Sequence, residues 1–224
     1  MTRKTMALAS MLVVTAMLVA AWFVGSSLPA DLPLPTHWGL DGKPDRFSDK
    51  WTALLMPAGL VAGISALLFF LPALEPRRQG LERSQGLYLW SWAALLIMGV
   101  IIQLAVISVA LRWSVHGTSF ILAGVGLVFA LIGNQLGKSR SMYLIGIRTP
   151  WTLASEEVWI KTHRLAGKMM VAGGLLMIAA AFLPLPGGLV ATLIIGVLVG
   201  AALVPVAYSY VLWRAELRRD QAGG

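Results

Sequence analysis

A polar stretch late in the 224-residue sequence combines an arginine, a histidine and acidic residues that could do chemistry. Arg148 and His163 are residue types that together bind a carboxylate or a phosphate through charge-assisted hydrogen bonds. The alternative is structural: Arg148 donates to helix-end carbonyls or lipid phosphates, and His163 fills an interfacial niche. Glu156 with His163 has the composition of an acid–base pair, yet the sequence offers no accompanying nucleophile or metal-ligand set. We therefore expect a binding site, with no catalytic residue, metal or cofactor.

A second polar stretch, residues 33–50, is rich in acidic residues and turn formers. Its aspartates recur at every fourth position, whereas a calcium-binding EF-hand loop needs ligands at alternate positions and a closing glutamate. We interpret them as solvated charges paired with neighbouring cations. The aspartates are Asp41, Asp45 and Asp49, and the cations are Lys43, Arg46 and Lys50. His37 alone cannot form a metal site, while Gly42 and Pro44 predict tight turns and hence a structured loop.

Long apolar segments separate these polar stretches. The chain is 58% hydrophobic and 12% charged, against about 25% charged residues in a typical soluble domain. An apolar helix of about 20 residues crosses the roughly 30 Å bilayer core. The predicted spans are 5–25, 52–74, 86–111, 118–136, 166–183 and 188–213. The sequence thus predicts an all-α integral membrane protein with a six-transmembrane-helix bundle, whose first span is an uncleaved anchor.

The distribution of Lys and Arg predicts the orientation, because cytoplasmic loops retain positive charge. Most of the 18 Lys and Arg residues fall at the N-terminus, in the second and fourth loops and in the C-terminal tail. We therefore expect a multi-pass protein of the bacterial cytoplasmic (inner) membrane with both termini cytoplasmic and loop 26–51 extracytoplasmic. The net charge of +8 is then assigned to anionic lipid, and no nucleic-acid partner is expected. Tryptophans near span ends, Trp92 among them, are expected in the aromatic belts.

Residues 137–165, here called the signature segment, are predicted on the cytoplasmic side. Pro150 disfavours a helical conformation at Thr149, and Ser155 is a candidate N-cap for a juxtamembrane helix that continues into the fifth span. Glu157 and Lys161 are spaced for an ion pair on that helix. One helical stripe is expected to be apolar or buried, and it comprises Trp159, His163, Ala166 and Met170.

The predicted spans lack the ionisable groups that ion-coupled transporters use. Gln103 suits an interhelical hydrogen bond, but a transporter or flippase for a peptide or lipid is the second hypothesis, favoured if Gln103 and Asn134 line a cavity. A membrane enzyme is the third, and it requires Glu156 and His163 to lie together. Glycine pairs allow close helix packing within the bundle or in an oligomer. The pairs are Gly59 with Gly63, Gly133 with Gly137, and Gly196 with Gly200.

The signature segment resembles a known family. Gly146-Ile147-Arg148-Thr149-Pro150-Trp151-Thr152-Leu153, followed by Glu157-Val158-Trp159 and Thr162-His163-Arg164, is similar to the signature of the SdpI family of bacterial membrane proteins. Gly133-Asn134 fits an upstream Gly-Asn of that family. The first loop resembles the associated N-terminal domain at His37, Gly42, Pro44, Asp45 and Lys50. The chain departs from the family at Gly137, Ser141 and Met142, where relatives often carry prolines and an asparagine.

The resemblance implies both an organisation and a function. It divides the chain into an N-terminal two-helix membrane region, 1–75, and an SdpI-like four-helix region, 76–224. Members give immunity to a secreted peptide toxin and, in the best-known case, tether a cytoplasmic autorepressor at the membrane. The implied partners are membrane lipid, a peptide toxin and a repressor protein. The implied partner-binding residues are Asn134, Gly146, Arg148, Thr149, Pro150, Trp151, Glu157, Trp159, Thr162 and His163.

Overall fold

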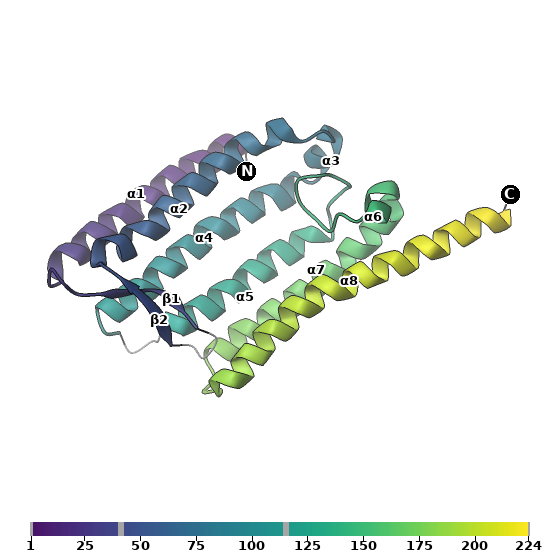
Figure 1. Cartoon of the computed structure of the whole chain (residues 1–224). Coiled ribbons are helices and arrows are strands. Elements are labelled where there is room, and N and C mark those ends of the chain that lie inside the picture. The colour runs from purple at the N-terminus through teal and green to yellow at the C-terminus, as the bar shows by residue number, and fades with distance from the viewer. Residues whose placement is uncertain (1, 40–42, 114–116, 224) are drawn as a thin grey trace.

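Six long helices dominate the structure, a computed structural model that describes residues 2–39, 43–113 and 117–223 (Figure 1). They are α1 (Arg3–Ser27), α2 (Lys50–Phe70), α4 (Gln85–Ala110), α5 (Gly117–Leu136), α7 (Glu156–Ala181) and α8 (Gly187–Gly223). Each is long and apolar enough to cross a membrane. The predicted six-span helical membrane fold is therefore confirmed. The juxtamembrane helix and the fifth span form one continuous helix, α7.

Shorter elements connect these helices. A 3-10 turn, η1 (Leu71–Leu74), continues α2 and leads to α3 (Arg78–Arg83), while α6 (Pro150–Ala154) precedes α7. The first loop contains two antiparallel strands, β1 (Leu34–Trp38) and β2 (Pro44–Ser48). The loop is thus structured, as predicted, but as a β-hairpin.

The long helices pack in a row. The α1–α2 pair lies on α4, which packs on α5, then α7 and finally α8 at the other edge (Figure 1). The β-hairpin lies at one end of the bundle along the direction of the helix axes, here called the hairpin end. The N-terminus, α3, α6 and the C-terminal part of α8 lie toward the other end, here called the loop end.

Buried polar side chains join α4 to the first two helices. Trp92 Nε1 donates to Ser10 Oγ at 3.0 Å and to Ser65 Oγ at 3.2 Å. Gln103 Nε2 donates to the carbonyls of Met17 at 2.8 Å and Leu54 at 3.2 Å. The prediction that Trp92 belongs to an aromatic belt is wrong, because its side chain is fully buried where three helices meet. Gln103 is the interhelical link that its polarity predicted.

Glycines bring α5 and α7 into backbone contact. A Cβ added at Gly167 would lie 2.5 Å from the carbonyl oxygen of Gly133, so neither position has room for a side chain. Close packing through Gly133 is thereby confirmed. At Gly59, Gly63 and Gly196 an added Cβ would meet no described atom of another element within 4 Å, so these three glycines show no close packing against the described part of the chain.

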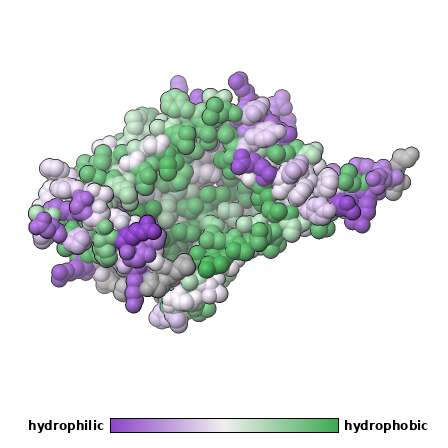
Figure 2. Space-filling model, viewed as in Figure 1, coloured by the Kyte–Doolittle hydropathy of each residue, from purple (hydrophilic) through white to green (hydrophobic). Residues whose placement is uncertain are grey.

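Apolar side chains cover the middle of the molecule and polar side chains gather at its two ends (Figure 2). Large apolar residues such as Leu12, Phe23, Phe182 and Leu203 are exposed. In water such a surface would be strongly unfavourable, whereas lipid is its natural solvent. The bundle therefore presents a lipid-facing belt between two polar ends.

The β-hairpin leads directly into α2. Asp49 is the N-cap of α2, accepting from the backbone amides of Trp51 at 3.1 Å and Thr52 at 3.0 Å, and hydrogen bonds from Thr52 hold the pKa of the Asp49 carboxyl below its usual value. Lys50 is buried and donates to the Leu28 carbonyl at 2.7 Å. The sequence predicted that the aspartates of this loop pair with its lysines and arginine. That prediction is wrong for Asp49, which caps a helix, and for Lys50, which donates to a carbonyl. The predicted turn at Asp41 and Gly42 lies outside the described residues.

Candidate functional site

The signature segment folds over the loop end as a short loop, α6 and the start of α7. Thr149 is extended, as predicted, and forms a capping box with Thr152 at the start of α6. Ser155 caps α7 by accepting from the Val158 amide at 3.2 Å. Glu157 and Lys161 form the predicted ion pair on the exposed face of α7. Local sequence signals therefore set the boundaries of both helices.

His163 holds the loop from the buried face of α7. Its Nε2 accepts from the Ile147 amide at 2.8 Å, and its Nδ1 lies 2.8 Å from the Trp159 carbonyl, so the ring carries its proton on Nδ1. The ring also stacks on Trp159 with 4.0 Å between centroids. Gly146 lies against both rings with a positive φ of 132°, and a Cβ there would lie 2.6 Å from His163 Nε2. Only glycine fits this position.

Glu75 anchors the same loop from the end of α2. It is 2% exposed, and its carboxyl oxygens accept from the amides of Arg77 at 2.8 Å, Tyr143 at 3.0 Å and Leu144 at 2.8 Å. Three backbone donors thus satisfy one buried acid. Sequence reasoning missed this residue, whose only signal was an acid directly after a predicted span.

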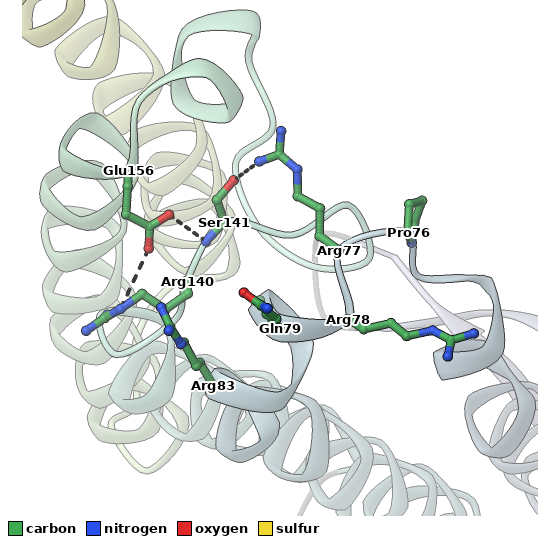
Figure 3. A pocket seen from close by; sticks show the side chains of 9 residues that line it. Pro76, Arg77, Arg78, Gln79, Arg83, Arg140, Ser141 and Glu156 are labelled. Atoms are coloured by element: carbon green, nitrogen blue, oxygen red, sulfur yellow. Dashed lines mark hydrogen bonds and ion pairs between the residues drawn. The ribbon is translucent and has the colours of Figure 1, made fainter.

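Arg77 provides a second anchor from the α2–α3 connection. Its guanidinium donates to Ser141 Oγ (Figure 3) and to the Leu153 carbonyl at 3.2 Å. It also lies over the Tyr143 ring, 4.9 Å from the centroid. Arg77 therefore joins both sides of the loop, a role that the sequence did not reveal because its partners lie 64 and 76 residues away.

The signature segment also contacts the last helix. Trp151 Nε1 donates to Ser209 Oγ at 2.6 Å, and its ring stacks on Trp213 at 5.9 Å between centroids. Ser155 Oγ donates to Glu216 Oε1 at 2.9 Å. The segment is thus fastened both to the connection between η1 and α3 and to α8.

The residues singled out for chemistry do not form a catalytic group. Arg148 is exposed and donates to the Tyr143 carbonyl, within its own loop, whereas His163 is fully buried. Glu156 pairs with Arg140 at 3.6 Å and accepts from the Ser141 amide at 3.3 Å. The hypothesis of a Glu156–His163 acid–base pair is therefore wrong. Within the described residues, no three His, Asp or Glu side chains gather as metal ligands.

The implied partner-binding residues divide by burial. The side chains of Trp159, Thr162 and His163 are buried and meet the protein interior. Four others are exposed: Asn134, Arg148, Pro150 and Glu157. Gly146, Thr149 and Trp151 are half-buried within the loop and α6. Gln103 is buried and Asn134 is exposed on α5, so the two do not line a common cavity as the transporter hypothesis requires.

The residues singled out in the first loop occupy the β-hairpin. His37 Nδ1 lies 2.6 Å from Asp45 Oδ1 across the two strands, and both side chains are about half exposed. Pro44 begins β2 opposite Trp38. Lys50 holds the start of α2 to the end of α1, and Gly42 lies outside the described residues. The hairpin that carries this pair lies at the opposite end of the bundle from α6 (Figure 1).

Comparison with known proteins finds family matches that include the signature segment and the first loop. Residues 138–209 match the SdpI/YfhL protein family, and residues 11–61 match a domain of unknown function, DUF1648. The chain is 26% identical over 155 residues to the protein named Immunity protein SdpI from Bacillus subtilis (strain 168). The aligned residues make up 69% of this chain and 71% of that protein. No solved structure is significantly similar. The resemblance is confirmed at the level of these two regions: in this helical membrane protein, residues 138–209 are similar to the SdpI/YfhL family and residues 11–61 to DUF1648.

Proposed function

We propose that the protein is an SdpI-like immunity and signalling protein, which protects a bacterial membrane against a membrane-active peptide toxin. The observation that carries this proposal is the similarity to Immunity protein SdpI along more than two thirds of both chains. Binding without turnover is sufficient for such a role. The separation of Glu156 from His163 supports a non-catalytic function, because a membrane enzyme at this surface would need these two side chains together.

The construction of the loop end supports a role in partner binding. Anchors from the connection between η1 and α3, from His163 of α7 and from α8 hold the signature segment in place, and preorganisation lowers the entropic cost of binding. Arg148 and Pro150 face outward from this held loop. We infer that they form the contact for a cytoplasmic partner, and that a repressor protein is that partner.

The charge pattern supports the assignment of this end to the cytoplasm. Arg3, α3, the signature segment and the C-terminal arginines lie toward the same end of the bundle. Positively charged loops stay in the cytoplasm. In this orientation both termini are cytoplasmic and the β-hairpin meets the toxin outside the cell.

The hairpin end has an apolar pocket that suits a membrane-active peptide. Its volume is about 430 Å³, and Trp38 of the hairpin lies beside Leu122 of α5, Ala181 of α7 and Ile194 of α8 in its lining. A peptide that inserts into the outer leaflet would bring apolar side chains to this depth. The toxin is therefore assigned to the hairpin end.

Toxin challenge tests the immunity function. The gene is deleted in its host, or expressed in a sensitive bacterium, and survival is measured against a panel of membrane-active peptides. The proposal predicts that the protein raises the inhibitory concentration of at least one peptide. Unchanged sensitivity to the whole panel would contradict it. The repressor assignment is tested separately by placing a photo-crosslinking residue at position 150, and it fails if no DNA-binding protein is captured in toxin-treated cells.

A further inference from the structure

A pocket lined with arginines opens beside the signature segment. It has a volume of about 520 Å³ and lies between the α2–α3 connection and residues 140–156 (Figure 3). Its lining residues are Pro76, Arg77, Arg78, Gln79, Gly80, Arg83, Arg140, Ser141 and Glu156. Four arginines therefore share the pocket with one acid.

Most of this positive charge lacks a protein counterion. Arg78 and Arg83 form no hydrogen bond or ion pair with any described residue, and both are exposed. Among the described residues, Glu156 at 3.6 Å is the only acid paired with Arg140, whose Nη1 also donates to the carbonyls of Lys138 at 3.4 Å and Ser139 at 3.3 Å. Arg77 donates to neutral oxygens. Two further acids lie near: Glu82 of α3 lines a separate hollow with Arg3, and the Glu75 carboxyl accepts from three backbone amides.

The side chains that line the pocket differ in whether they point into it (Figure 3). In Figure 3, Arg83 points toward Arg140 and Glu156, and Gln79 projects its amide into the space between α3 and the signature segment. Arg78 points away from that space. Arg83 and Arg140 are therefore the cations best placed to meet a ligand, and Gln79 can supply a neutral donor.

Close packing fixes the distance between the two walls. A Cβ added at Gly80 would lie 2.1 Å from the Ser141 carbonyl oxygen, so the backbone of α3 lies directly against the backbone of the signature segment at this point. The Arg77–Ser141 hydrogen bond joins the same walls. The pocket is thus a built feature with defined sides.

We propose that this pocket binds a phosphate group, supplied by an anionic phospholipid headgroup or by a soluble phosphate. Guanidinium groups match phosphate oxygens with paired, charge-assisted hydrogen bonds. An anion also relieves the repulsion among neighbouring arginines. The lining residues follow η1 and α5 in sequence and include the first residue of α7, so they lie where three apolar segments end, and lipid headgroups are expected at such a place. The proposal does not depend on the immunity function.

A bound phosphate would have a structural consequence. Arg83 belongs to the α2–α4 connection, whereas Arg140 and Ser141 belong to the signature segment. A ligand that bridges Arg83 and Arg140 adds a further bond between the two walls. Phosphate binding is therefore expected to stabilise the signature segment against local opening.

Thermal unfolding of the purified full-length protein in neutral detergent tests this site. One arm adds phosphatidylglycerol, with phosphatidylcholine as reference, and the other adds inorganic phosphate at constant ionic strength. A ligand that binds only the folded state raises the melting temperature. The expected result is a saturable rise in at least one arm; a rise only with lipid identifies a headgroup, and a rise only with inorganic phosphate identifies a soluble ligand.

Arg83→Gln is the test variant and Arg219→Gln is its matched control. Arg83 has no described partner, and Arg219 is an exposed arginine of α8 outside the pocket. Arg83→Gln should raise the half-saturating concentration roughly tenfold, the effect of one charge-assisted hydrogen bond, while Arg219→Gln leaves it unchanged. The proposal is overturned if neither arm gives a saturable rise, or if both variants weaken binding equally, since that would indicate general surface charge.

Discussion

The carboxyl group of Glu75, at the end of the second span, accepts a 3.0 Å hydrogen bond from the backbone amide of Tyr143, 68 residues further along the chain. The Leu144 amide donates to the same oxygen at 2.8 Å. The N-terminal pair of helices and the signature segment are therefore joined through one buried acid. Whatever moves the α2–α3 connection will move the loop that carries Arg148.

Removal of the Glu75 side chain should loosen the signature segment. Glu75→Ala leaves three backbone amides without their acceptor, and each buried unsatisfied group costs about 1–3 kcal/mol. Trypsin should then cleave faster at Lys138, Arg140 and Arg148, as followed on gels of the protein in detergent. Glu75→Gln keeps one acceptor oxygen and should show a smaller effect. Equal cleavage of wild type and Glu75→Ala would show that this anchor does not hold the loop.

Gly146→Ala should destabilise the loop end. Its φ of 132° is unfavourable for alanine, and the added Cβ would clash with the His163 ring. A strained position of this kind costs about 1–3 kcal/mol, so the apparent melting temperature should fall. Gly59→Ala is the matched control, because a Cβ added there would meet no atom of another described element within 4 Å. A melting temperature unaffected by Gly146→Ala would contradict the described loop conformation.

Arg148→Ala should remove protection and leave the protein in the membrane. The side chain is exposed and its bond is to a carbonyl of its own loop, so its loss costs little stability. Survival under peptide challenge and the amount of protein in the membrane fraction are measured side by side. Arg214→Ala, another exposed arginine of the loop end, serves as the reference. Full protection by Arg148→Ala would refute the assigned role of Arg148.

Single-cysteine labelling should locate the two polar ends. The sequence contains no cysteine, so each introduced thiol is unique. Arg46→Cys in the hairpin should react with a membrane-impermeant maleimide on intact cells, whereas Ala154→Cys at the end of α6 should react only after permeabilisation. Both positions are exposed, so accessibility reports the side of the membrane. The reverse pattern would invert the proposed orientation.

The sequence by itself determined the spans and several local boundaries. Each span needs about 20 apolar residues, and that requirement can be read from composition alone. Helix caps such as Ser155 and the extended Thr149 before Pro150 are also decided within a few residues of chain. The family resemblance rested on the same local order of residues.

Tertiary structure decided what the polar residues do. Trp92 was expected at the membrane interface, but its position on α4 directs it between Ser10 and Ser65. His163 was a candidate ligand, and the fold places the Ile147 amide against its free ring nitrogen. The physical reason is that hydropathy is a property of each segment, whereas a hydrogen bond depends on which segments meet. Glu75 and Arg77 acquire their roles only when the loop after α5 folds back onto the end of α2.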